Sequence, residues 1–147
     1  MLNLIKLTEN KIIFVDACVM IDYLWDKLEN ADEFELLLQN TKADVLFVPY
    51  YQVYEIFYDT EMKIKDKTIS NFSCLDVLEL FESLKIKITP AINMAISTKA
   101  AKIKASGGLS HYDALLIAEV QNTSNAVLLT KDWEFVKKGF ENVIFVD

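Results

Sequence analysis

The sequence is poor in the residues that interrupt regular structure or build disulfide and zinc frameworks. Its 147 residues contain 3 glycines, 2 prolines, 2 cysteines and 1 histidine. So few glycines and prolines indicate regular elements joined by short loops, and they argue against an all-β sandwich. Two cysteines make no disulfide framework, and a single histidine leaves no His/Cys cluster with the spacing of a zinc site.

Long apolar runs are also missing. No stretch reaches the roughly 18 residues needed to span a bilayer, so no transmembrane helix and no membrane partner are expected. The first residues, MLNLIKLTEN, lack the basic start, the long apolar segment and the small-residue cleavage site of a signal peptide. The expected location is therefore the cytoplasm.

Basic residues are outnumbered by acids, 15 to 22, which gives a net charge of −7. This balance counts against nucleic-acid binding, because phosphate contacts rest on basic surface. It also suggests that some acids gather where a cation or a basic partner neutralises them. Because 52% of the residues are hydrophobic, the chain can bury a real core. We expect residues 1–147 to form a single domain.

Apolar runs bounded by turn residues alternate with helical patterns along the chain. The predicted strands are Lys11–Val15, Asp44–Val48, Ile86–Ile88, Ala126–Thr130 and Val143–Val146. Predicted helices start near Val19 and cover 31–40, 49–65, 73–84, 89–106, 110–122 and 131–139. This alternation predicts a three-layer α/β/α sandwich with a central, mostly parallel sheet of about five strands.

Capping residues define several of the predicted helix starts. Ser73 with Asp76 three residues later has the pattern of a capping box. Thr89 followed by Pro90, and Ser110 in a later segment, are further predicted N-caps.

Two acids follow predicted strand ends, and two lie near predicted helix starts. Asp16 directly follows the first strand, and Asp132 comes two residues after Thr130 ends the fourth. Each also has an ordinary interpretation as a helix N-cap. Asp113 fits the acidic half of a capping box, and Glu55 fits a solvated helix position. In a parallel sheet, however, sites lie in the crevice beyond the carboxyl ends of the strands.

Apolar neighbours count against the ordinary interpretations of Glu55 and Asp113. Glu55 stands among Val53, Ile56 and Phe57, and Asp113 precedes the apolar run ALLIA. Carboxylates in such surroundings are costly unless they are paired or bound to a cation. Four that converged would raise one another's pKa unless a hard divalent cation entered, and oxygen ligands suit Mg²⁺ or Mn²⁺. The chemistry indicated is phosphodiester hydrolysis.

Four segments carry a resemblance to a known family. In chain order they are FVDACVMIDYL, VPYYQVYEIFYD, LSHYDALLIAEV and VLLTKDWEFV. Together they resemble the PIN domain, and most of all the compact toxin nucleases of VapC type, from Lys11 to Asp147. The resemblance implies a PIN-like fold and an acidic catalytic and metal-binding site made of Asp16, Glu55, Asp113 and Asp132.

Three residues are expected to support this site. Thr130 matches the small hydroxyl residue that precedes the last acid by two positions, where it could orient a ligand or water. The family often has a hydroxyl residue and then Asn after its first aspartate, where this chain has Ala17 and Cys18. Glu134 could assist a metal beside Asp132, although a first-turn acid also suits the helix dipole.

The resemblance further implies an activity and partners. The leading interpretation is a Mg²⁺- or Mn²⁺-dependent endoribonuclease that cleaves RNA phosphodiester bonds through metal-activated water. It would be the toxin of a toxin–antitoxin pair, with RNA as substrate, a small antitoxin protein as inhibitor and a homodimer as the assembly. An acidic crevice would suit an arginine-bearing segment of such a partner.

Several alternatives remain open. The chain could be a PIN-fold scaffold that binds RNA or protein with little or no nuclease activity, which the Ala17–Cys18 departure favours. A metal-dependent phosphatase is less well supported, because no second acid follows Asp16 by two residues. Cys18 and His111 would form a nucleophilic pair only if they met in space. The remaining candidates for RNA or partner contact are Tyr50, Tyr51, Tyr54, Tyr58, Lys99, Lys102, Lys104 and Lys131.

Overall fold

Five parallel strands form the centre of the computed structural model, which describes residues 2–89 and 92–147. Every neighbouring pair of strands is parallel. Across the sheet the order is β3 (Ile86–Thr89), β2 (Leu46–Pro49), β1 (Ile12–Val15), β4 (Ala126–Thr130) and β5 (Val143–Phe145). The first strand is thus central, and the chain moves outward from it in both directions.

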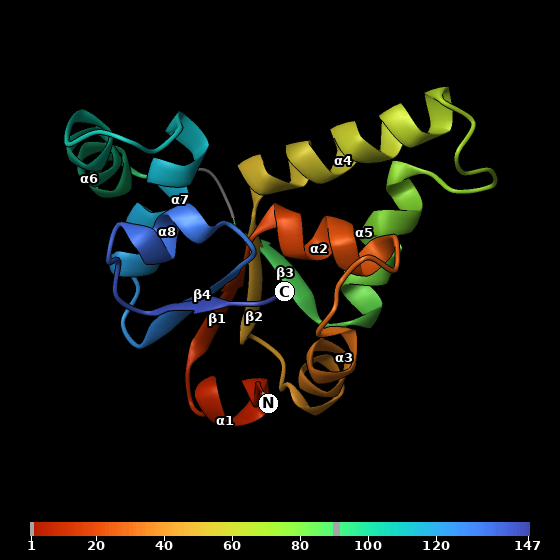
Figure 1. The fold of residues 1–147 in the computed structure, drawn as a ribbon, viewed down its shortest axis with the longest axis horizontal. Helices are drawn as coiled ribbons and strands as arrows, with labels where there is room; N and C mark the ends of the chain where they lie inside the picture. Colours follow the sequence, from red (N-terminus) through yellow and green to blue (C-terminus); the bar gives the residue numbers. More distant parts are fainter. Residues whose placement is uncertain (1, 90–91) are drawn as a thin grey trace.

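Helices cover both faces of the sheet, which confirms the predicted three-layer sandwich (Figure 1). One face carries α2 (Ala17–Leu24), α3 (Ala31–Asn40), α4 (Tyr50–Lys65) and α5 (Cys74–Ser83). The other carries α6 (Met94–Ala105), α7 (His111–Gln121) and α8 (Trp133–Lys137). No helix among the described residues is long and apolar enough to cross a membrane.

Alternate residues of the central strands serve the two cores. Ile13 and Val15 of β1 pack in the core of the first face, whereas Phe14 packs in the core of the second. Strand β4 is buried at all five positions. Such a continuous apolar run is what a strand with both faces covered requires, so the sequence pattern and the packing agree.

Most predicted helix starts are confirmed, and one is wrong. Ser73 makes the full capping box with Asp76, and the Ser110 hydroxyl accepts the Asp113 amide. Thr89, however, ends β3 in register with Pro49 and caps no helix. Helix α6 begins at Met94, capped by Asn93, because the Asn93 side chain accepts the Ile96 amide at 2.9 Å. Pro90 lies outside the described residues.

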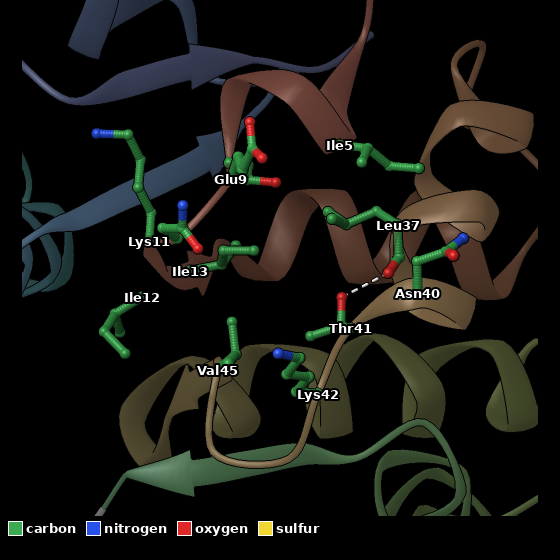
Figure 2. Close-up of a pocket in the computed structure, with 12 residues that line it drawn as sticks. Ile5, Glu9, Lys11, Ile12, Ile13, Leu37, Asn40, Thr41, Lys42 and Val45 are labelled. Carbon is green, nitrogen blue, oxygen red and sulfur yellow. Dashed lines mark hydrogen bonds between the residues drawn. The ribbon is translucent and has the colours of Figure 1, made fainter.

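The N-terminal residues form a short helix at the amino ends of the strands. Helix α1 (Leu4–Leu7) packs against α3 and buries Leu4 completely. Beside it lies a cavity of about 440 Å³, with Ile12 and Val45 in its wall (Figure 2). The buried Thr41 hydroxyl there donates to the Leu37 carbonyl, so it is already satisfied. This cavity contains none of the predicted site residues.

Candidate active site

Asp16 lies at the carboxyl end of the central strand β1, where it is 5% exposed. Its amide pairs with the Leu129 carbonyl of β4 at 2.9 Å, and its Oδ2 accepts the Thr130 hydroxyl at 2.7 Å. Burial raises the pKa of Asp16 to about 6, with further increases from the charges of Asp113 and Asp132. The Thr130 hydrogen bond acts in the opposite direction. A buried carboxyl with a pKa so high is expected at a functional site.

The other three predicted acids come from three further elements, and each interacts electrostatically with Asp16. Glu55 projects from α4, Asp113 from the first turn of α7, and Asp132 is the N-cap of α8. Burial raises the pKa of Glu55, and the charges of Asp16 and Asp113 add to the increase. Burial also raises the pKa of Asp113, with a contribution from Asp132. Asp16 therefore lies near enough to each of the other three acids for their negative charges to repel its own.

Thr130 joins the ends of β1 and β4. Its fully buried hydroxyl donates to Asp16 and accepts the Asp132 amide at 2.9 Å. The Cys18 thiol approaches the same oxygen at 3.8 Å and accepts the Lys131 amide at 3.4 Å. The Thr130 hydroxyl thus holds the Asp16 carboxylate and the Asp132 backbone in position relative to each other.

The two aspartates that follow strands differ in their capping behaviour. Asp132 caps α8, because its Oδ1 accepts the Glu134 amide at 2.9 Å. Asp16 occupies the N-cap position of α2, yet its side chain makes no capping bond. The first amide of α2, that of Ala17, donates to Gln52 Oε1 of α4 at 2.7 Å. Gln52 could not be identified from the sequence, because a glutamine inside a helix gives no local signal.

Replacing Asp132 with Asn is expected to destabilise the fold far less than replacing it with Ala. Asn caps a helix as well as Asp, so Asp132→Asn should change the unfolding free energy by less than about 0.5 kcal/mol, whereas Asp132→Ala should lower it by about 1 kcal/mol. Chemical denaturation of the two variants measures this difference. Equal losses in both would show that the charge of Asp132, and not its capping bond, stabilises α8.

Glu134 and Cys18, which were predicted to support the site together with Thr130, both make contacts with nearby residues of the protein. Glu134 pairs its side chain with Lys137 at 3.8 Å in the first turn of α8. Burial raises the pKa of the Cys18 thiol to about 12, and its contacts are with Thr130 and the Lys131 amide. A thiol that stays protonated is a poor nucleophile, which counts against a Cys18–His111 pair.

Some expected binding residues are already engaged. Lys131 forms a salt bridge with Asp22. Tyr51 is buried and donates to Glu119 at 2.7 Å, so it cannot stack on a base. Three tyrosines of α4 do remain exposed, Tyr50, Tyr54 and Tyr58. The Tyr54 and Tyr58 rings stack on each other with centroids 6.5 Å apart.

The donor set fits a hard divalent cation in its chemistry. All four acids offer carboxylate oxygens, and burial, with a smaller contribution from neighbouring negative charges, raises the pKa of Asp16, Glu55 and Asp113. Within residues 2–89 and 92–147, however, no three His, Cys, Asp or Glu side chains are grouped tightly enough to hold a metal ion as they stand. Ligation would therefore require these side chains to turn toward one another.

Without added divalent cations, stability should fall as the pH rises from about 4 to about 6. The folded-state pKa of Asp16, about 6, lies above its ordinary 3.8, so the folded protein binds the proton more tightly than the unfolded chain. This contribution to stability is complete below the pKa that Asp16 has in the unfolded chain. It is lost as the pH rises through the pKa that Asp16 has in the folded protein. Asp16 alone should account for a loss of about 3 kcal/mol in the unfolding free energy.

Urea denaturation in EDTA between pH 4.5 and 7 measures this slope. Asp16→Asn is the control, because it removes the titrating group and should flatten the dependence. A wild-type unfolding free energy that increases across this range would contradict the prediction.

The sheet and its acids define a class of protein: a parallel α/β domain with a group of carboxylates at the carboxyl edge of its sheet. The PIN domain family model matches residues 13–141. The chain therefore belongs to the PIN domain family, whose members are nucleases that generally use divalent metal ions. A search of curated proteins gives no match.

Solved structures share this fold at low sequence identity. A toxin–antitoxin complex from Klebsiella pneumoniae has 16% identity and a TM-score of 0.63, covering 90% of this chain and 95% of that one. VapBC2 from Rickettsia felis, bound to a promoter DNA fragment, has 13% identity and a TM-score of 0.65, covering 92% and 98%. PAE2754 from Pyrobaculum aerophilum has 18% identity and a TM-score of 0.59, covering 94% and 91%.

Proposed function

We propose that this protein is a divalent-metal-dependent endoribonuclease and the toxin of a toxin–antitoxin pair. The observation that carries the proposal is the group of four carboxylates around the buried Asp16, at the edge of the sheet where parallel α/β proteins place their sites. Membership of a nuclease family supports hydrolysis of phosphodiester bonds. The choice of RNA and of Mg²⁺ or Mn²⁺ rests on the resemblance to VapC-type toxins.

Each residue has a role in this proposal. Asp16, Glu55, Asp113 and Asp132 would hold the metal. When bound, a divalent cation supplies Lewis-acid stabilisation of the phosphate and activation of water. Thr130 holds the Asp16 carboxylate in place by its hydroxyl donation at 2.7 Å. The carboxylates must be deprotonated to bind a cation, so activity should increase with pH above about 6, the pKa of Asp16.

The test is cleavage of single-stranded and structured RNA transcripts by the full chain. Cleavage is expected with Mg²⁺ or Mn²⁺, and EDTA should abolish it. Activity that persists in EDTA would overturn the metal-dependent mechanism. Hydrolysis of a small phosphomonoester, with no cleavage of RNA, would favour the phosphatase alternative.

The proposed inhibitor is a small protein that places arginine in the acidic crevice. Every one of the 15 basic residues of this chain is lysine, so the chain itself supplies no guanidinium group to its acids. The net charge of −7 would also attract a basic partner. One structural neighbour is described as a toxin–antitoxin complex and another as VapBC2 bound to promoter DNA, which supports looking for such a partner. A small basic protein encoded next to this gene should co-purify with the chain and block its nuclease activity.

The second candidate is a PIN-fold binding scaffold. It is favoured by Ala17 and Cys18, which replace polar residues often found after the first aspartate of the family. A scaffold should show neither RNA cleavage nor thermal stabilisation by Mn²⁺. Light scattering would show whether the protein forms the proposed homodimer, whichever of the two functions it has.

A further inference from the structure

One residue of α4 packs in the core on the opposite face of the sheet. Helix α4 lies on the first face, and its buried Val53 and Ile56 belong to the core there. Tyr51, in the first turn of α4, is 5% exposed and belongs with residues of α7 to the core of the second face. Its side chain therefore reaches across the carboxyl edge of the sheet, on either side of which α4 and α7 lie (Figure 1).

Tyr51 contacts α7 at two places. Its ring lies nearly parallel to that of Tyr112, with an interplanar angle of 10° and centroids 6.1 Å apart. Its hydroxyl donates to Glu119 Oε2 at 2.7 Å. Burial raises the pKa of this hydroxyl, and the negative charges of Glu119 and Asp16 raise it further. The hydroxyl therefore stays protonated and remains a hydrogen-bond donor.

These two contacts join helices whose backbones meet little within the described residues. Helix α7 packs mainly against α6, and α4 packs mainly against α2. Tyr112 and Glu119 are about two turns apart and lie on one face of α7. Contacts that far apart along a helix fix its direction as well as its distance, and a hydrogen bond adds an orientation that apolar packing lacks.

Each helix that Tyr51 joins carries one of the predicted acids beside the contact. Glu55 lies one turn after Tyr51 on the same side of α4, because residues four apart share a helix face. Asp113 directly follows Tyr112 in the first turn of α7. After burial and the charge of Asp16, the charge of Asp113 also raises the pKa of Glu55, so the two carboxylates lie in the same region.

We propose that Tyr51 is a positioning residue that holds α4 and α7 at the separation from which Glu55 and Asp113 can bind the same divalent cation. The inference rests on the proposed metal-dependent function. Rotation of the two side chains brings their carboxylates together only if the two helix backbones stay within reach of each other. A cation binds its oxygen ligands at fixed distances, so a shift of α7 relative to α4 would weaken ligation by both acids.

The test is the Mn²⁺ affinity of the metal-free full chain, measured by calorimetry. Tyr51→Phe keeps the ring on Tyr112 and removes the hydrogen bond to Glu119. It should weaken binding by about 10-fold, the low end of the loss for an outer-shell partner, because Tyr51 acts on the acids through the helix backbones. Glu119→Met removes the acceptor and should have the same effect.

Combining the two substitutions distinguishes one shared hydrogen bond from two independent effects. Tyr51→Phe/Glu119→Met should bind Mn²⁺ about 10-fold more weakly than the wild type, because each substitution breaks the same bond. A loss of about 100-fold, the product of two independent losses, would overturn the proposal. The double variant places apolar groups on both sides of the broken bond, so it should fold even if a single variant does not.

Glu119→Gln and Thr60→Val are the matched controls. Glutamine keeps an oxygen that accepts the Tyr51 hydroxyl but removes the charge, so Mn²⁺ affinity should stay within a few-fold of the wild-type value. Thr60 is fully buried on α4 and donates to the Ile56 carbonyl at 2.9 Å, so Thr60→Val loses a buried hydrogen bond on the same helix. It should lower thermal stability and leave Mn²⁺ affinity unchanged. A 10-fold loss of affinity in either control would overturn the proposal.

The remaining outcomes separate this proposal from the proposed function. Wild-type affinity in Tyr51→Phe or in the double variant overturns the positioning role. If the wild type neither binds Mn²⁺ nor cleaves RNA, the proposed function fails, and Tyr51 is judged by crystal structures of the metal-free wild type and double variant. The separation between the Glu55 and Asp113 carboxylates should differ between them, and an unchanged separation overturns the positioning role.

Discussion

Asp16→Asn should lower metal-dependent RNA cleavage by more than about 100-fold and, at the same time, stabilise the protein at pH 7. Loss of an outer-shell partner costs up to about 100-fold in metalloenzymes, so loss of a ligating charge should exceed that. The asparagine oxygen can still accept the Thr130 hydroxyl, so the local hydrogen bond is retained. The readouts are the rate of RNA cleavage with Mg²⁺ and the urea midpoint in EDTA.

The expected gain in stability follows from the raised pKa of Asp16. Holding a charged carboxylate at a site where its pKa is about 6 instead of 3.8 destabilises the folded state by about 3 kcal/mol at neutral pH. The neutral amide removes that cost, and a gain on the order of 1–3 kcal/mol is expected. Loss of activity with gain of stability is the pattern of a residue retained for function.

Asp32→Asn provides the control for both measurements. Asp32 is an exposed acid in the first turn of α3, so its substitution tests the loss of one negative charge away from the crevice. It should leave cleavage unchanged. Asp16→Asn with wild-type cleavage would remove Asp16 from the catalytic group and favour the scaffold alternative.

Thr130→Val should reduce both activity and stability. Valine keeps the shape of threonine, but it deprives the Asp16 carboxylate of a donor and the Asp132 amide of an acceptor. Leaving the buried carboxylate and the half-buried amide unpaired should lower the unfolding free energy by about 1–3 kcal/mol. The freed Asp16 carboxylate should lower cleavage by about 10-fold to 100-fold. Denaturation and cleavage rates measure the two effects.

Thr130→Ser distinguishes the hydroxyl from the methyl group. Serine retains a donor and an acceptor at the same position, so cleavage should stay within a few-fold of the wild-type rate while some packing is lost. A serine variant as inactive as the valine variant would show that the methyl contacts, and not the hydroxyl, position Asp16.

The strands were predictable because their signal is local. The run of apolar residues in β4 and the alternation of Ile13, Phe14 and Val15 reflect burial on both faces of the sheet. The predicted helix start at Thr89 was wrong because a Thr-Pro pair fits either a helix start or a strand end. Only the pairing of β3 with β2 distinguishes the two.

The candidate acids were predictable from their positions after strands, but their local roles were not. Asp16 and Asp132 look alike in the sequence, yet only Asp132 makes a side-chain capping bond. Asp16 instead accepts the hydroxyl of Thr130, which is 114 residues away along the chain. Interactions at such separation leave no periodicity or spacing that a single sequence reveals.

The hydroxyl bond between Thr130 and Asp16 also joins two parts of the chain that are made at different times. The two residues are 114 positions apart, and β4 adds to the sheet beside the much earlier β1. During synthesis, β1 can pair with β2 long before β4 exists. A growing chain therefore has no assembled acidic centre until residue 132 has been translated. Any nuclease activity is delayed until the ribosome has made nearly the whole domain.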